Sequence, residues 1–195
     1  WKPIFVLGYE HQFVGGGEHP LNTLHNDDRK LVGRAVTCTY CPTRPDLHDV
    51  QFARGAEDGL QGNYNQWVID HLYERDVVVC DMYDKIYKGT FLGGNLTTAL
   101  HNRTKTGGAV IWGGIRDVEQ MKKVPDVQVY YRGIDPTPIR EFVMKDWNDI
   151  TNFGGAVCLP GDIVFGAGGG VLFIPAHLVA DVVEGAAKTH VKDDF

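Results

Sequence analysis

The sequence predicts a mixed α/β domain with flanking helices, and three observations support this fold class. The chain has 195 residues, which is enough to bury one core without disulfides or metal ions. Between about residues 31 and 133, apolar strand-like runs alternate with amphipathic helical runs. The later stretch "GGAVCLPGDIVFGAGGGVLFIP" holds three short apolar runs separated by glycine and proline, which is typical of an antiparallel meander.

Each element is expected from its own local pattern. Continuously apolar runs such as "DVVVC" predict buried strands, and apolar residues on one face of "NLTTALHNRT" predict a helix that begins after a glycine turn. We expect strands at 31–40, 76–82, 108–112 and 127–133, and helices at 65–74, 95–104, from 116 and at 176–188. Residues 1–30 are expected to form an N-terminal arm or loop region with little core of its own, and residues 31–195 a single α/β domain.

The composition argues against two classes of partner. The 19 basic and 25 acidic residues give a net charge of −6, and no run of lysine or arginine forms a stripe that could follow phosphates, so no nucleic acid is expected as a partner. No apolar stretch approaches the roughly 20 residues that span a bilayer, so no membrane is expected either. The start of the sequence lacks the features of a signal peptide, and the expected location is cytoplasmic.

Two motifs with possible chemistry are interpreted as structural. Cys38 and Cys41 form a CxxC inside a strand-like run, but no second ligand pair accompanies them, so core packing is favoured over a redox or zinc site. The "GAGGG" at residues 166–170 is followed by the strand-like "VLFIP" rather than by a helix. This order favours a tight hairpin over a phosphate-binding loop.

The clearest candidate site lies at two glycine-fronted helix starts, "GGNL" at residues 93–96 and "GGIRD" at residues 113–117. Each follows a strand, so each presents unpaired N–H groups and the positive end of a helix. If the two loops meet, the amides and the Arg116 guanidinium suit a carboxylate, and Asp117 suits a hard cation. The alternative is that Asp117 caps its own helix and Arg116 forms a surface ion pair.

Four motifs in order, "GTFLGGNLTTALHNRT", "GGAVIWGGIRDVEQ", "YYRGIDPTPI" and the glycine-rich meander, resemble the RraA-like family. This family includes metal-dependent 4-hydroxy-4-methyl-2-oxoglutarate aldolases. The resemblance implies a swivelling β/β/α domain that assembles as a homotrimer or homohexamer with sites at subunit interfaces. It also implies that Arg116 binds the carboxylate of a small 2-oxo acid, that Asp117 ligates Mg²⁺ or Mn²⁺, and that Gly93, Gly94, Asn95 and Leu96 contact the substrate.

The function that the resemblance implies is a divalent-metal-dependent carbon–carbon lyase that releases pyruvate, by retro-aldol cleavage or by decarboxylation of an oxaloacetate-like acid. Glu119 is a further catalytic candidate and Arg132 a further substrate-binding candidate, with a surface residue at the end of a strand as the alternative for Arg132. The chain departs from the aldolase pattern where Gly94 and Gln120 stand in place of acidic residues. The alternative function is therefore a non-catalytic RraA-like binding or regulatory protein, the type represented by the regulator of ribonuclease E.

Overall fold

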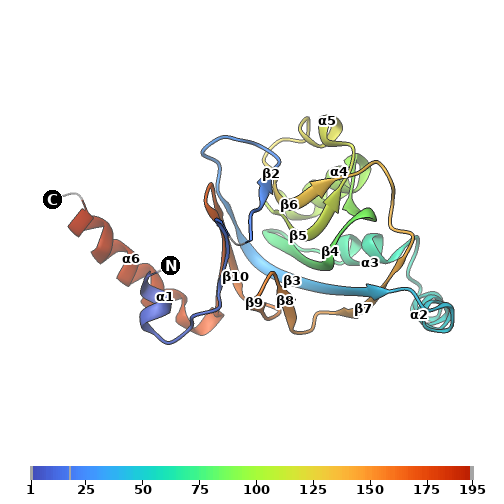
Figure 1. Cartoon of the computed structure of the whole chain (residues 1–195), viewed down its shortest axis with the longest axis horizontal. Helices are drawn as coiled ribbons and strands as arrows, with labels where there is room; N and C mark the ends of the chain where they lie inside the picture. Colours follow the sequence, from blue (N-terminus) through green and yellow to red (C-terminus); the bar gives the residue numbers. More distant parts are fainter. Residues whose placement is uncertain (1, 18, 194–195) are drawn as a thin grey trace.

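The computed structural model describes residues 2–17 and 19–193 and confirms the mixed α/β class. At its centre, four neighbouring parallel strands follow the order β3-β4-β5-β6, as Figure 1 shows. Their bounds are Leu31–Pro42 for β3, Asp76–Leu92 for β4, Gly108–Ile115 for β5 and Gln128–Ile134 for β6. Residues of β4 alternate between the two faces and are buried on both, which explains the unbroken apolar run "DVVVC".

Antiparallel strands extend this sheet on both sides. The order continues from β3 to β10, β11 and β1 on one side, and from β6 to β2 on the other, while β7 pairs with the far end of β3. The bounds are Ile163–Ala167 for β10, Gly170–Ile174 for β11, Phe13–Gly15 for β1, Asn22–Thr23 for β2 and Phe142–Trp147 for β7. A separate hairpin joins β8, Thr151–Phe153, to β9, Ala156–Cys158. The glycine-rich segment is the tight β10–β11 hairpin that the sequence predicts.

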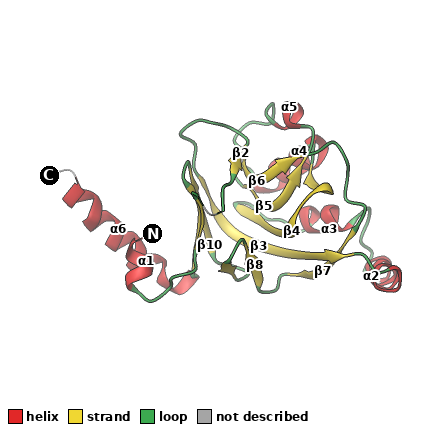
Figure 2. Ribbon diagram, in the orientation of Figure 1, coloured by secondary structure: helices red, strands yellow, loops and turns green. Residues whose placement is uncertain are grey.

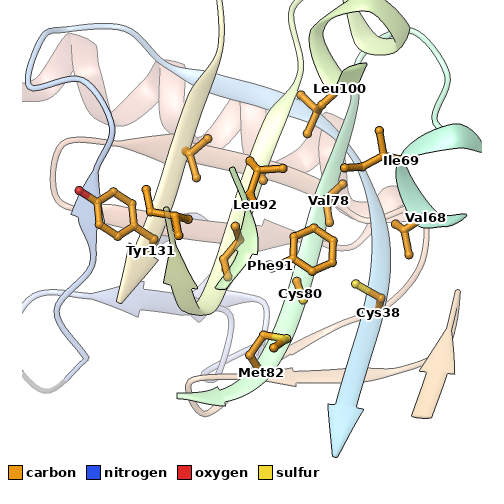
Figure 3. Packing of buried hydrophobic residues seen from close by; sticks show 14 of the residues in the cluster. Cys38, Val68, Ile69, Val78, Cys80, Met82, Phe91, Leu92, Leu100 and Tyr131 are labelled. Atoms are coloured by element: carbon orange, nitrogen blue, oxygen red, sulfur yellow. The ribbon is translucent and has the colours of Figure 1, made fainter. Parts of the chain in front are cut away.

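Helices cover one face of the parallel strands, as the ribbon in Figure 2 shows. α3, Tyr64–Asp70, and α4, Gly94–Thr104, pack on this face and enclose the largest apolar cluster. Figure 3 shows Val68, Ile69 and Leu100 of these helices pointing toward Val78 and Cys80 of β4. A second cluster on the opposite face includes Val79, Phe153 and Phe173. None of the described helices is both long enough and apolar enough to cross a bilayer.

Several elements differ from the expectation. Residues 45–57 form α2, Pro45–Glu57, although no helix is expected there, and the strands β7 and β8 are likewise additional. The helix expected from residue 116 is the short α5, Val118–Met121, which begins one residue after Asp117. The last helix is α6, Val179–Asp193, which follows a short 3₁₀ turn at Ala176–Leu178.

The first thirty residues contribute to the core of the molecule. They form α1, Lys2–Val6, together with β1 and β2, and they bury Ile4, Val14 and Leu24 in three different apolar clusters. Figure 1 shows α1 beside α6, away from the main sheet. Ile4 lies with Val182 of α6 in one small cluster, so residues from opposite ends of the chain share a common packing surface.

Candidate functional site

The two glycine-fronted helix starts lie together at one edge of the parallel sheet. β4 ends at Leu92, Gly93 is the N-cap, and α4 begins at Gly94; β5 ends at Ile115 and is followed by Arg116. Because β4 and β5 are parallel neighbours, their carboxyl ends reach the same edge. The Arg116 N–H donates to the Leu92 carbonyl at 2.9 Å, which fixes the second loop against the first.

Asp117 directs its carboxylate at α4 and away from its own helix. The Gly94 N–H donates to Asp117 Oδ2 at 3.3 Å, and although Asp117 is the N-cap of α5, its side chain makes no capping hydrogen bond. Its φ of 56° lies in the left-handed region, which aspartate tolerates better than most residues but which is uncommon without glycine. The capping alternative therefore does not describe this carboxylate, which is half exposed at the positive end of α4.

Hydrogen bonds to β4 hold the Arg116 side chain in place. Its Nη1 donates to the Thr90 carbonyl at 3.1 Å and to Thr90 Oγ1 at 3.2 Å. Its Nε lies 3.7 Å from Asp117 Oδ2, and its side chain is 23% exposed. Nη2 has no hydrogen-bond partner among residues 2–17 and 19–193, so one edge of the guanidinium fork is available to a ligand.

Thr90 is a positioning residue that the sequence analysis missed. It is fully buried, and its hydroxyl accepts from Arg116 and donates to the Thr137 carbonyl. Thr137 is fixed in turn, because its hydroxyl accepts from the Lys88 N–H at 2.6 Å and donates to Asp135. A single threonine in a strand carries no signal of such a role, since its partners lie 26 and 47 residues away in sequence.

Gly93 and Gly94 allow the two loops to approach one another closely. A Cβ atom at Gly93 would lie 2.7 Å from Asp117 Oδ2, and one at Gly94 would lie 2.2 Å from Gln120 Cδ. The Gln120 amide also donates to Asn95 Oδ1 at 3.2 Å. The two positions that lack the acidic residues of the aldolase pattern are therefore in direct contact, and the Gln120 side chain fills the space that a side chain at position 94 would need.

The remaining predicted residues lie in three different settings. Leu96 packs partly buried against the main apolar cluster, so its side chain belongs to the core, while its backbone lies in the first turn of α4. The Glu119 side chain is 91% exposed and lies 3.8 Å from Lys122 Nζ. Arg132 is engaged elsewhere, because it binds the Asp84 carboxylate at 2.8 and 3.2 Å and stacks on Trp112.

The oxygen donors near Asp117 fit a weakly held divalent ion. The described residues contain no group of three or more His, Cys, Asp or Glu side chains arranged for a metal. One carboxylate, from Asp117, lies beside the neutral amides of Asn95 and Gln120. Mg²⁺ commonly keeps several waters and uses one or two carboxylates, so this donor set suits a mostly hydrated ion.

Comparison with known proteins places this chain in a family. The RraA-like model, described as Aldolase/RraA, matches residues 10–173. Protein DlpA of Legionella pneumophila is 31% identical over 156 residues, which are 79% of this chain and 23% of DlpA, so the chain spans about a quarter of that relative. Residues of both loops lie within the region that the family model matches.

Solved structures share the fold. Streptomyces coelicolor RraAS2, an unusual member of the RNase ES inhibitor RraA family, aligns with a TM-score of 0.78 at 21% identity over 100% of this chain and 87% of its own. An uncharacterised Pseudomonas syringae protein aligns with a TM-score of 0.76 at 20% identity, over 99% of this chain and 78% of its own. The family that these comparisons identify contains both aldolases and non-catalytic inhibitors of RNase E. Because the family model matches residues 10–173, most of the sequence, the chain belongs to the RraA-like family.

Proposed function

We propose that the protein is a divalent-metal-dependent carbon–carbon lyase that releases pyruvate from a small 2-oxo acid. The observation that carries the proposal is the convergence of Arg116, Asp117 and the first turn of α4 at one sheet edge. This arrangement supplies a cationic fork, helix N–H groups and one carboxylate within a few ångströms of each other. Such a set suits a ligand with a carboxylate next to a keto group.

The residues of the chain would act mainly by binding and orientation. Arg116, held by Thr90, would grip the substrate carboxylate, and the N-terminal amides of α4 would add hydrogen bonds to it. Asp117 would hold Mg²⁺ or Mn²⁺, with Asn95 and Gln120 positioned to orient its waters. When bound, the ion would act as a Lewis acid on the keto oxygen. The breaking carbon–carbon bond would leave its electron pair delocalised toward that oxygen, close to the positive end of α4.

A second candidate is a non-catalytic binding or regulatory protein, and one observation favours it. Gln120 occupies the space beside Gly94, so the site offers one carboxylate where the aldolase pattern has more. Charge count sets much of the affinity for hard cations, and a single exposed carboxylate binds them weakly. Under this alternative, the Arg116 loop would serve as part of a protein-binding surface.

The proposal includes an assembled, cytoplasmic protein. A homotrimer or homohexamer would allow a neighbouring subunit to supply groups that the described residues lack near Asp117, and the general acid or base is the most important of them. The expected small-molecule partner is a 2-oxo acid. The molar mass from size-exclusion chromatography with light scattering tests the assembly directly, and a monomer at micromolar concentration would contradict it.

The decisive experiment measures pyruvate release from oxaloacetate and from 4-hydroxy-4-methyl-2-oxoglutarate, with Mg²⁺ or Mn²⁺ and then with EDTA. We expect metal-dependent turnover that EDTA abolishes and that Asp117→Asn lowers by about 100-fold or more. Asparagine is the better replacement than alanine here, because it keeps the left-handed backbone at position 117 accessible.

Glu57→Gln is the matched control, since it removes one exposed carboxylate at the end of α2 and should leave turnover unchanged. Full activity of Asp117→Asn would refute the assigned role of Asp117. No turnover with either acid in a folded oligomer would favour the binding-protein alternative. That alternative predicts an interaction that survives EDTA.

A further inference from the structure

A cavity lies on the sheet face opposite to α3 and α4, between β3, β4 and β5 and the β8–β9 hairpin. Its volume is about 640 Å³, which is within the range of small-molecule sites. Thr39 and Cys41 of β3, Asp81 of β4 and Trp112 of β5 line it from the sheet side. Asn152 and Gly154 of the β8–β9 hairpin close it from the opposite side. The described lining residues include no member of the Arg116–Asp117 site.

Asp81 is the distinctive group of this cavity. The residue is only 7% exposed, and its Oδ1 accepts the Tyr83 N–H at 2.9 Å. Oδ2 has no hydrogen-bond partner among the described residues, yet it is not among their fully enclosed, unpaired atoms, so it faces the cavity. Burial raises the pKa of the Asp81 carboxyl above its ordinary value of 3.8, while the Tyr83 N–H acts in the opposite direction.

The other acidic and lysine side chains that line the cavity already have partners. Asp84 binds the Arg132 guanidinium at 2.8 and 3.2 Å. Lys145 Nζ lies 2.9 Å from Asp146 Oδ2. Among the described lining residues, Asp81 is therefore the carboxylate without a cation. A buried charge without a partner destabilises the folded protein, and a cation that enters the cavity would offset this destabilisation.

The rest of the wall also suits a small organic cation. Trp112 already has the Arg132 guanidinium 4.5 Å from its ring centre, and the exposed Tyr83 adds a second aromatic ring near the opening. Asn152 Oδ1 accepts the Gly155 N–H at 3.0 Å, and the Thr39 hydroxyl pairs with that of Thr151 at 2.9 Å. The described residues here form no cluster for a metal ion, and the free carboxylate disfavours an anion.

We propose that this cavity is a binding site for a primary ammonium compound with a short carbon chain. The ammonium group donates to Asp81 Oδ2, and the chain lies against Trp112 and Tyr83. This site does not depend on the lyase proposal, because the two sites share no described residue.

The test uses isothermal titration calorimetry of the full chain with 1,4-diaminobutane and with the uncharged 1,4-butanediol at equal ionic strength. We expect saturable one-site binding of the diamine and none of the diol. Asp81→Asn, which is isosteric, should weaken diamine binding by at least about tenfold, because a charge-assisted hydrogen bond is lost. Glu57→Gln, which removes one exposed carboxylate from α2, should bind the diamine like the parent chain.

A thermal scan without ligand separates a binding role from a structural one. At pH 7 the Asp81→Asn variant should melt at or above the parent temperature, because the parent buries an unpaired charge. That difference should shrink as the pH falls from 7 toward 3.8, because the raised pKa lets the folded parent take up its proton at a higher pH than the unfolded chain does. A lower melting temperature for Asp81→Asn at pH 7 would overturn the proposal, since Asp81 would then stabilise the free protein.

Three other results would also overturn it. The first is no diamine binding to the parent chain at millimolar concentration. The second is equal diamine binding by the parent and Asp81→Asn, and the third is equal binding of diol and diamine. Lys145→Met addresses the one lysine among the described lining residues, whose side chain could swing toward Asp81. This variant should bind the diamine at least as tightly as the parent, and loss of binding would contradict the proposal.

Discussion

The contact between Gly94 and Gln120 accounts for the presence of both residues. A side chain at position 94 would overlap Gln120, whose nearest atom would lie 2.2 Å from the new Cβ. The φ of Gly94 is not positive, so the overlap, rather than the backbone, restricts this position. Two changes that look independent in the sequence therefore form one coupled pair beside Asp117.

Restoring a carboxylate at this pair should strengthen metal binding. We expect Gly94→Asp combined with Gln120→Ala to raise Mn²⁺ affinity by about tenfold over the parent, because a second carboxylate joins Asp117 in a space cleared of the glutamine. Mn²⁺ titration followed by electron paramagnetic resonance measures the change.

The single Gly94→Asp variant is the control for this prediction. It should gain less affinity than the double variant and lose more stability, because Gln120 still occupies the space. Additive effects of the two substitutions would show that the residues are not coupled.

The sequence predicts residues of the candidate site only where their chemistry is visible locally. Arg116 and Asp117 stand out as a charged pair after a glycine turn, and the structure brings them to the start of α4. Thr90 and Asp81 are a threonine and an aspartate within a strand, and their roles depend on which side of the bent β4 each one faces. No local pattern contains that information.

At the scale of elements, α2 shows why a helix can escape sequence analysis. Pro45 lies in its first turn, and its apolar residues Leu47 and Phe52 only partly face the core. Gly55 is the buried residue of this helix and sits against the indole of Trp67 in α3. The glycine that weakens the helical pattern is therefore the residue that lets the two helices touch.

This contact leads to an unusual prediction for a glycine in a helix. Gly55→Ala should lower the free energy of unfolding by about 1–3 kcal/mol, because the new Cβ would lie 2.3 Å from the Trp67 ring. The gain of about 1 kcal/mol in helix propensity does not offset this overlap. Urea unfolding followed by circular dichroism gives the value.

Ala53→Ser, at an exposed position of the same helix, controls for substitution in α2 and should change stability by less than about 0.5 kcal/mol. A Gly55→Ala protein that is more stable than the parent would mean that α2 does not pack closely on α3.

The sequence predicts the alternating strands and helices because their apolar residues recur with a regular period. It does not predict the strands that complete the sheet. β7 pairs with β3 across more than a hundred residues, and its sequence "FVMKDW" mixes apolar and charged residues. Such strands form because a partner strand is present to pair with them, so no local sequence pattern predicts them. The short β1 and β2 are formed in the same way, by pairing with β11 and β6.

For the whole molecule, the four cysteines offer a test of how tightly the fold is closed. Cys38, Cys80 and Cys158 are buried, Cys41 is half-buried, and all four are free thiols. Burial raises the pKa of the Cys41 thiol, so it too should react slowly. In the native protein, iodoacetamide should label Cys41 first, as mass spectrometry of the intact and digested chain would show.

All four thiols should be alkylated in unfolding concentrations of urea, and Cys41→Ser should leave the native chain almost unlabelled. Labelling of Cys38 as fast as Cys41 under native conditions would contradict the closed packing of β3 between the two apolar clusters. It would also favour a redox or zinc role for Cys38 and Cys41 over core packing.

The packing of Ile4 and Val14 against residues 171–182 affects the order in which this chain can fold during synthesis. Val14 lies opposite Val171 in the sheet, and Ile4 packs with Leu172 and Val182. During synthesis on the ribosome, these early apolar side chains therefore emerge long before their partners do. They stay exposed until the residues of β11 and α6 have been made, because these elements supply the partners that cover them.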